Sequence, residues 1–310
     1  MHLPPSTVSL PDEQPSSQVT WFTNGSDLAK IVAEHFYTLP RGTIHTIKCV
    51  TPSAYETFLD KLPTTYGEVF DKLRYDWDAA KGELTLRMPT AIHEVFVTQI
   101  TMLLDQKVEH AVSKYQDLAE KYMPAGSTDL TDDMGNKRSP DGSWYFDDNH
   151  NPSFILEVAH SQQSEDARAK AEKTHAGSEG QTKTIVAFDI EYWNPEGCNR
   201  RSDTNEARAC DYTIYRGASS RDDDGTTYSL DDSVTGTINP DPGDETPALV
   251  MTVADFTPQE SRTPMPADQI VLTHGEIQSV LNRAERIQKK LDAAAAKRLE
   301  DKRGFAHRCT

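Results

Sequence analysis

The sequence predicts an α/β protein in which a mixed sheet is flanked by helices. The main observation is the order of segments between residues 140 and 193. Two strand-like stretches, PDGSWYF and PSFILEVA, come before a helix rich in Ala, Lys and Glu, and a third strand, TKTIVAFDIEYW, follows it. The second stretch is almost wholly apolar, which is typical of a central strand covered on both faces. Strand, strand, helix and strand in this order favour a mixed sheet.

Composition divides the chain into five segments. Pro and Ser are frequent at the start, Asp, Gly, Thr and Ser are frequent after residue 193, and apolar residues recur at helical spacing near the end. The predicted segments are a disordered lead (1–19), an N-terminal α/β prefix (20–65), the core (66–193), an acidic insertion or linker (194–247), and a strand with a C-terminal amphipathic helix (248–304).

The prefix has the pattern of a helix, a strand and a second helix. Ser26 is the predicted N-cap of the first helix, which Pro40 ends, and the strand TIHTIKCV follows. Pro52 begins a short helix that runs to Leu62. We expect these elements to form a small layer packed on the core.

A hairpin and a long helix lead into the core. RYDWDAAKGELTLRMP predicts two strands around a turn at residues 80–82, with Leu84 and Leu86 alternating inward. Thr90 is the predicted cap of an amphipathic helix that continues to about Tyr122, and Glu94 lies near its start.

The charge balance bears on the class of partner. The 310 residues have a formal net charge of −17, whereas affinity for nucleic acids comes largely from Lys and Arg. Much of the acid lies in segments predicted as loops, so the charge weakens a nucleic-acid role without excluding it. Between residues 282 and 308, nine Lys or Arg stand against four Asp or Glu, a net of +5.

Cysteine usage and hydropathy bear on localisation. The four cysteines form no CxxC pair, so neither a zinc site nor a redox dithiol is predicted. The N-terminus lacks the pattern of a secretory signal, and no segment approaches 18 consecutive apolar residues. We expect an intracellular protein, cytoplasmic or nuclear, with reduced thiols and no membrane partner.

Two carboxylates in the core strands need a chemical explanation. Asp141 lies on one strand, and Glu157 lies 16 residues later in the middle of an apolar strand. A buried, ionised carboxylate costs several kcal/mol unless a cation or a donor meets it. Neighbouring strands that each present one carboxylate on the same side can hold a divalent ion through oxygen ligands. Asp141 and Glu157 are therefore candidate metal ligands.

The order PDGSW, ILEVAHSQ, DARAK, a Gly and a strand resembles the PD-(D/E)xK restriction-endonuclease-like superfamily. It is most similar to a bacterial branch of restriction endonucleases assigned from sequence, and to uncharacterised fungal proteins that share the pattern. The resemblance runs from Met88 to Trp193. It implies a restriction-endonuclease-like mixed sheet and metal-dependent hydrolysis of phosphodiester bonds. The implied cofactor is Mg²⁺ or Mn²⁺, and the implied substrate is nucleic acid, with DNA favoured over RNA.

The resemblance assigns roles to four residues. Asp141 and Glu157 match the two metal ligands, and Glu94 matches an acidic residue on the first helix that supports the metal. Ala159 stands where the family usually has a Lys, two residues after the Glu. Lys170 matches a displaced Lys on the next helix, which would position the attacking water or stabilise charge at phosphorus.

Each of these residues also has a structural alternative. Asp141 in Pro-Asp-Gly suits a turn, and Glu157 suits a buried ion pair. Lys170 suits a solvated helix face, and Lys173, one turn away, could take its catalytic place. Glu94 suits a helix N-terminus, where the dipole favours an acid.

Three functions follow from these alternatives. The leading one is a metal-dependent endonuclease, and the second is a catalytically inactive relative that keeps the fold as a binding module. The third is assembly into a homo-oligomer through the C-terminal helix, which begins at Thr273 or His274. His160 and Gln162, just after the Glu strand, are further candidates for polar contacts. Metal binding separates the first two functions, and truncation after about residue 273 tests the third.

Overall fold

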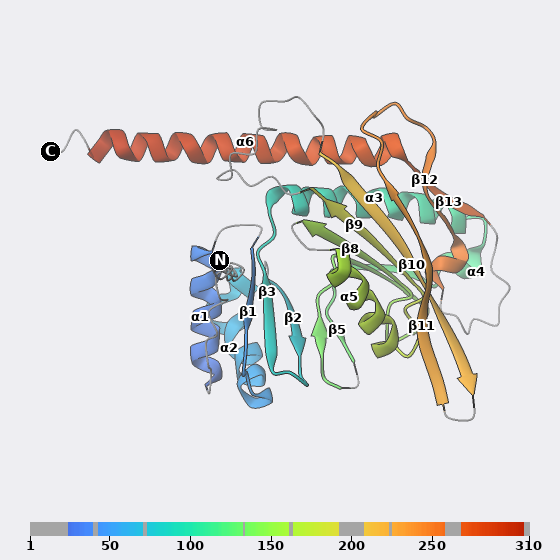
Figure 1. Cartoon of the computed structure of the whole chain (residues 1–310), viewed down its shortest axis with the longest axis horizontal. Coiled ribbons are helices and arrows are strands. Elements are labelled where there is room, and N and C mark those ends of the chain that lie inside the picture. Colours follow the sequence, from blue (N-terminus) through green and yellow to red (C-terminus); the bar gives the residue numbers. More distant parts are fainter. Residues whose placement is uncertain are drawn as a thin grey trace, which may run out of the picture.

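A computed structural model of the chain describes residues 24–39, 43–70, 73–132, 134–160, 164–191, 208–222, 225–257 and 268–306. Within these ranges the chain is a mixed α/β protein with six α-helices, one 3-10 helix and three sheets (Figure 1). The lead predicted for residues 1–19 lies outside them. None of the described helices has both the length and the apolar composition to cross a membrane.

The N-terminal layer packs two helices on a small antiparallel sheet. Its hydrophobic cluster extends from Leu28 to Met88, so the predicted boundary at residues 65 and 66 falls inside it. The hairpin of the layer therefore shares a core with the prefix. The elements of the layer are α1 (Gly25–Thr38), β1 (Ile44–Ile47), α2 (Pro52–Phe70), β2 (Arg74–Asp78) and β3 (Glu83–Arg87).

Two details of this layer differ from the sequence prediction. The N-cap of α1 is Asn24, whose Oδ1 accepts from the Ser26 backbone N at 3.0 Å. Helix α2 does not stop at Leu62 but continues through Pro63, and a kink at Tyr66, where φ is −135° and ψ is 45°, separates it from a second helical piece that ends at Phe70. Val69, in this second piece, is fully buried in the same hydrophobic cluster as Leu62.

The central sheet has six strands in the order β11-β10-β9-β8-β7-β4. Strands β8 and β9 are parallel, and all the other neighbours in this sheet are antiparallel. This is the mixed sheet that the sequence predicted. The strands are β4 (Tyr122–Gly126), β7 (Gly142–Phe146), β8 (Phe154–His160), β9 (Thr184–Ile190), β10 (Cys210–Asp222) and β11 (Gly225–Thr237).

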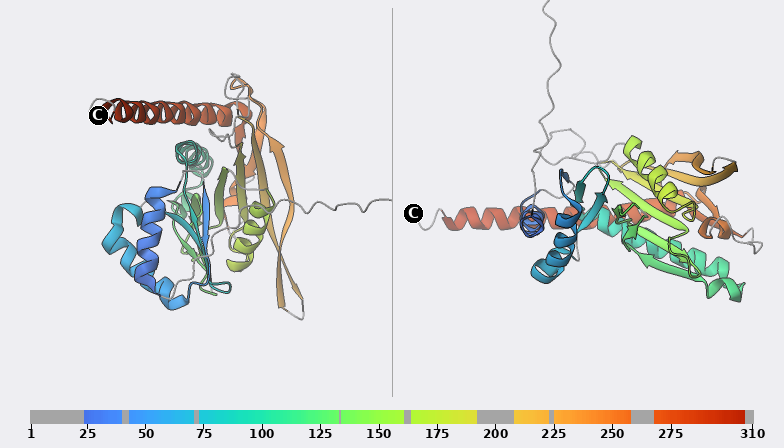
Figure 2. Two further views of the ribbon diagram at one scale, coloured as in Figure 1. Left: turned by 60° about the vertical axis from the view of Figure 1, so that its left-hand side comes forward. Right: turned by 90° about the horizontal axis from the view of Figure 1, so that it is seen from below.

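Helices α3 (Ala91–Val112) and α5 (Ser164–Gly177) cover opposite faces of this sheet (Figure 2). Successive side chains of a strand point to opposite faces. Leu156 accordingly belongs to the hydrophobic cluster that contains α3, whereas Ile155 packs with Ala171 of α5. Glu157 shares the face of Ile155, so it points towards α5.

Helix α3 is shorter than predicted. Thr90 caps it as expected, accepting from the His93 backbone N at 3.3 Å, but the helix ends at Val112 instead of near Tyr122. Lys114 and Tyr115 turn away to contact Asp268, and the short helix α4 (Gln116–Ala119) follows.

The acidic segment predicted as an insertion or linker contains a long hairpin. Strand β10 pairs with β9 from Cys210 to Arg216, and both β10 and β11 extend the central sheet. Tyr212 and Ile214 alternate into the same cluster as α3. The many Asp and Gly residues of this segment are typical of a loop, although β10 pairs with β9, which lies some 25 residues earlier in the chain.

The C-terminal part adds a two-stranded sheet and the longest helix. Strands β12 (Pro247–Thr252) and β13 (Gln269–Thr273) pair antiparallel, and β13 was not predicted. The 3-10 helix η1 (Val253–Phe256) follows β12. Helix α6 (His274–Ala306) begins where expected, packs along α3, and extends past the body of the molecule (Figures 1 and 2).

The connection from β4 to β7 joins the two main sheets. It contributes the short strands β5 (Leu130–Thr131) and β6 (Lys137–Arg138) to the N-terminal sheet, where β6 pairs with β2. The chain then returns to the central sheet at Asp141. The N-terminal layer therefore lies directly beside the start of β7.

Candidate functional site

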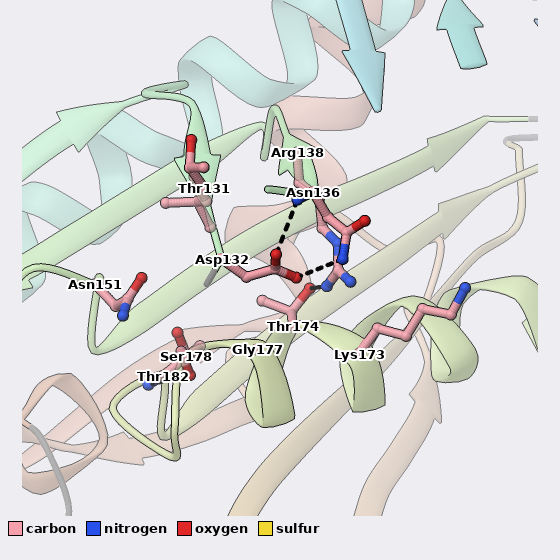
Figure 3. A pocket seen from close by; sticks show the side chains of 11 residues that line it. Thr131, Asp132, Asn136, Arg138, Asn151, Lys173, Thr174, Gly177, Ser178 and Thr182 are labelled. Atoms are coloured by element: carbon pink, nitrogen blue, oxygen red, sulfur yellow. Dashed lines mark hydrogen bonds between the residues drawn. The ribbon is translucent and has the colours of Figure 1, made fainter. Parts of the chain in front are cut away.

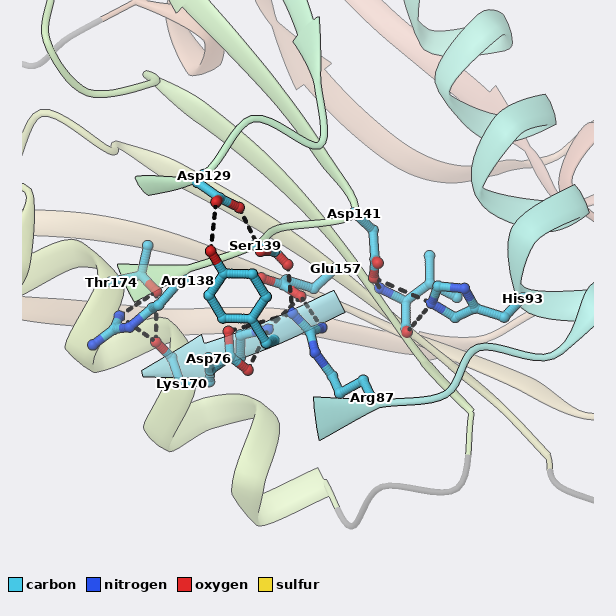
Figure 4. A network of polar contacts seen from close by, with 12 residues as sticks. Asp76, Arg87, His93, Asp129, Arg138, Ser139, Asp141, Glu157, Lys170 and Thr174 are labelled. Carbon is cyan, nitrogen blue, oxygen red and sulfur yellow. Dashed lines mark hydrogen bonds and ion pairs between the residues drawn. The ribbon is translucent and has the colours of Figure 1, made fainter. Parts of the chain in front are cut away.

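Strand register brings the two predicted carboxylates together. Gly142 pairs with Leu156 in the antiparallel β7–β8 ladder, so Asp141 lies opposite Glu157 on the neighbouring strand. The two carboxylates contact different groups. Asp141 lies by the Val158 backbone and His93 of α3, whereas Glu157 lies by Lys170 of α5 and Arg87 of the N-terminal layer (Figure 4).

Asp141 is buried, and only one of its oxygens is satisfied. Its Oδ2 accepts from the Val158 backbone N at 2.7 Å and lies 3.4 Å from His93 Nε2. Its Oδ1 is buried and has no hydrogen-bond partner among the described residues. Burial alone would raise the pKa of Asp141, but His93, with Arg87 and Lys170 nearby, holds it well below its usual range.

His93 links Asp141 to Glu94. Its Nε2 lies 3.0 Å from the Val158 carbonyl O, and its Nδ1 lies 3.5 Å from Glu94 Oε1, within ion-pair distance but without hydrogen-bond geometry. Burial lowers the pKa of His93, but Asp141 and then Glu94 outweigh burial and raise it to about 9. The imidazole is therefore protonated at neutral pH and carries a positive charge beside Asp141.

Glu157 meets two cations. Its Oε2 accepts from Lys170 Nζ at 2.8 Å, and Arg87 Nη1 lies 3.8 Å from the same oxygen. Burial and the neighbouring charge of Asp141 nevertheless raise the pKa of Glu157 above its usual value. The two carboxylates are thus shifted in opposite directions, an arrangement typical of sites where acid and base roles are divided.

The N-terminal layer supplies two residues that the sequence analysis missed. Arg87, at the end of β3, lies 3.3 Å from Asp76 Oδ1 and also donates to the Ser139 carbonyl. Asp76 Oδ2 in turn lies 3.9 Å from Lys170 Nζ. Burial lowers the pKa of Arg87, but Asp76, Glu157 and other carboxylates raise it above its ordinary value.

A sequence signal for Arg87 and Asp76 did exist. In β2 and β3 the residues that alternate with the buried Leu84 and Leu86 are polar, so one face of the hairpin carries charge. A strand face that is polar yet turned towards another layer is a candidate site surface. The pattern alone could not show that this layer was the central sheet.

The other predicted residues are placed less centrally. Glu94 is half-exposed and contacts His93, which stands between it and Asp141. Lys173 pairs with Asp78 at 3.7 Å, and no contact of it with Glu157 is found. The side chain of His160 and the whole of Gln162 lie outside the described part of the chain.

Charge in the site is balanced. Asp76, Asp141 and Glu157 face Arg87, His93 and Lys170, three carboxylates against three cations. In the part of the chain that the structure describes, no group of three or more His, Cys, Asp and Glu side chains is arranged to hold a metal. The pair Asp141 and Glu157, with the unpartnered Oδ1, is the part of the site that could accept a cation.

A groove of about 720 Å³ runs beside the site, between β2, β6 and α5. Asp76 and Lys170 line it together with Arg138, whereas Asp141 and Glu157 are not among its lining residues. A volume of this size suits a small molecule or part of a polymer chain. Its other lining cations are Lys81, Lys137 and Lys173.

A second hollow behind this groove is too small for a substrate. It measures about 20 Å³, room for roughly one water molecule (Figure 3). Arg138 Nη1 donates to Thr174 Oγ1 at 2.6 Å there, and Asp132 accepts from Asn136. These polar groups are already partnered, so this hollow is a structural junction between α5 and the β5–β6 turn.

Comparison with known proteins gives no assignment: no protein-family model matches the chain, and no curated protein matches it significantly.

Proposed function

We propose that this protein is a metal-dependent nuclease that hydrolyses phosphodiester bonds with a restriction-endonuclease-like core. The observation that carries the proposal is the contact of Lys170 Nζ with Glu157 Oε2 at 2.8 Å, near Asp141, which directly precedes the adjacent strand β7. Two carboxylates and one Lys are the functional groups that the resemblance implies. Lys170 supplies from α5 the amine that Ala159 cannot supply from β8.

The order of elements also supports the proposal. Helix α3, strands β4, β7 and β8, helix α5 and strand β9 follow one another, with the short strands β5 and β6 inserted before β7. The helices lie on opposite faces of a sheet with one parallel pair. Asp141 directly precedes the second of the four sheet strands, and Glu157 lies in the third, as the resemblance implies.

The residues fit a divalent cation such as Mg²⁺ or Mn²⁺. Asp141 Oδ1 is buried without a donor, and Glu157 has a raised pKa because it is buried beside Asp141. A cation shared by the two carboxylates would satisfy the oxygen and offset their repulsion. When bound, such an ion would polarise a phosphate oxygen and lower the pKa of its water.

The chain's own residues supply the remaining functions. Lys170 would release Glu157 and stabilise negative charge that develops at phosphorus. Arg87, fixed by Asp76, would add a second positive charge on the same side. His93 holds Asp141 in one orientation through Oδ2, which leaves Oδ1 turned away from the Val158 backbone.

The second candidate is a nuclease-fold binding module without catalysis. The balance of three carboxylates by three cations favours it, because Lys170 and Arg87 already neutralise Glu157 without a metal. This candidate predicts weak or absent binding of divalent ions.

Calorimetry with Mn²⁺ and cleavage assays on DNA and RNA test the proposal. We expect Asp141→Asn and Glu157→Gln to lose both binding and cleavage. Lys170→Met should retain binding and lose cleavage by at least about 100-fold. Glu172→Gln is the matched control, since Glu172 is an exposed carboxylate on α5 that pairs with Arg168. Weak or absent Mn²⁺ binding together with no cleavage in the wild type would favour the binding module and would leave both carboxylates structural.

A further inference from the structure

The outer part of α6 has no packing partner among the described residues. Every described side chain from Lys289 to Ala294 is exposed, and Leu291 is 52% exposed. Figures 1 and 2 show this part of the helix extending beyond the rest of the molecule. Four consecutive Ala residues, 293–296, have the highest helix propensity and favour a helix without tertiary contacts.

One face of this helix is basic. It carries four exposed cations, Arg283, Arg286, Lys290 and Lys297. The last three follow Arg283 by 3, 7 and 14 residues. At 3.6 residues per turn these positions fall within an arc of about 60° and span about 21 Å along the axis. We call these four residues the basic stripe. Glu285 and Asp292, the acidic residues between its ends, lie on the opposite side of the helix by the same spacing.

The cations of the stripe are not neutralised within the described chain. Arg283 donates to Gln99, a neutral residue of α3, and the other three form no ion pair with a described residue. Residues 282–308 have a net charge of +5, so the rest of the chain carries −22, the difference between −17 and +5. The positive charge is thus collected on one helix of an acidic protein, which predicts a polyanionic partner.

The stripe does not suit a second helix or a membrane. A helical partner needs an apolar seam with a heptad repeat, and between Gln288 and Lys297 the sequence has one large apolar residue, Leu291. A helix that lies on a membrane needs an apolar face of Trp, Phe or Leu opposite its charges. A rod of regularly spaced phosphates needs neither, because Lys and Arg bind it by releasing counterions.

We propose that the basic stripe of α6 binds the sugar-phosphate backbone of a nucleic-acid duplex, without reading its sequence. The preference for a polyanion follows from α6 alone, and the choice of nucleic acid rests on the proposed function. The stripe would hold the duplex by its phosphates outside the groove, independently of the carboxylates at the site.

Fluorescence anisotropy of a labelled 20-base-pair DNA duplex with the full chain tests this, in EDTA so that metal binding plays no part. The wild type should lose on the order of 100-fold in affinity between 50 and 200 mM salt, because about four phosphate contacts give a slope near −3.6. Changing all four stripe residues to Gln should abolish this dependence. Circular dichroism should show unchanged helix content.

A matched pair of double variants separates position from charge. Arg286→Gln with Lys290→Gln should reduce the salt slope by about two, whereas Lys289→Gln with Lys30→Gln removes the same charge off the stripe and should leave the slope nearly unchanged. An equal reduction of the salt slope in both double variants would overturn the proposal. Binding to vesicles of phosphatidylcholine and phosphatidylserine but not to DNA would also overturn it, as would loss of self-association in the quadruple variant with unchanged DNA affinity. Because the assay needs no metal, its outcome is independent of whether the carboxylate site is active.

Discussion

Two buried aspartates, Asp255 and Asp141, differ in how the charge of the carboxylate is compensated by hydrogen-bond donors. Asp255, in η1, has both oxygens fully partnered: Oδ1 accepts from Arg216 and Thr184, and Oδ2 accepts from the backbone and side chain of Thr252. Asp141 uses one oxygen and leaves the other without a donor. Both have a lowered pKa, so both are ionised at neutral pH.

This difference indicates that Asp255 stabilises the fold, whereas Asp141 has one oxygen left that could bind a cation. The donors of Asp255 join η1 to β9 and β10, and they offset the cost of burying its charge. Asp141 faces Glu157, a carboxylate whose own pKa is raised. A protein gains nothing in stability from such a pair, which is why the site, and not the η1 corner, is the candidate for function.

The largest expected effect is on the free energy of unfolding. Asp255→Ala should reduce it by about 3 kcal/mol, because Arg216 and Thr184 lose their shared acceptor. Glu157→Gln should change it by less than about 1 kcal/mol, or increase it, because a buried charge with a raised pKa is removed. Urea denaturation measures both. Asp268→Ala, at a surface ion pair with Lys114, is the control and should leave the free energy of unfolding nearly unchanged. An equal loss at Glu157 and Asp255 would make the site carboxylate structural.

The next effect is a pH dependence confined to the site. The pKa of His93 rises from 6.5 to about 9 on folding, so its contribution is complete below pH 6.5 and is lost as the pH rises through 9. At about 1.4 kcal/mol per pH unit, the upper limit of this loss is about 3 kcal/mol. Denaturation in EDTA between pH 6 and 9.5 should show it in the wild type and in Asp255→Asn. The profile of His93→Gln should have a clearly smaller slope over the same range, and an unchanged slope in that variant would contradict the assignment.

The smallest effect is stabilisation by a divalent ion. At a Mg²⁺ concentration ten times the dissociation constant, the wild type should gain about 1.4 kcal/mol. Asp255→Asn should keep this gain although it starts less stable, and Asp141→Asn should lose it. Thermal unfolding with and without Mg²⁺ gives the comparison. A gain that survives in Asp141→Asn would place the ion elsewhere on the acidic surface.

Local patterns predicted the local elements well. The helix expected between the second and third core strands is present as α5, and the hairpin before Met88 turns where expected. These elements depend on caps, turn residues and alternation within a few positions. The segment that contains β10 was interpreted as an insertion or linker, because the place of this strand depends on pairing with β9 across the chain and its Asp-rich neighbours resemble a loop.

The candidate site was likewise predicted only where its residues lie close together along the chain. Asp141, Glu157 and Lys170 lie within 30 residues of one another, so the order of elements was enough to bring them together. Arg87 and Asp76 come from another layer, and their contacts depend on how two sheets are stacked. His93 gave no signal because its role depends on the orientation of Asp141.

The two-residue strand β6 has a consequence for how the molecule can be divided. Because β6 belongs to the N-terminal sheet, the segment that delivers Asp141 is anchored in one layer, while Glu157 belongs to the other. Arg87 and Asp76 come from the first layer as well. A fragment reduced to the central sheet would lose Arg87 and Asp76, two of the six charges around the site, and with them the cation 3.8 Å from Glu157 and the carboxylate 3.9 Å from Lys170. The charge environment of Glu157 is therefore a property of both layers together.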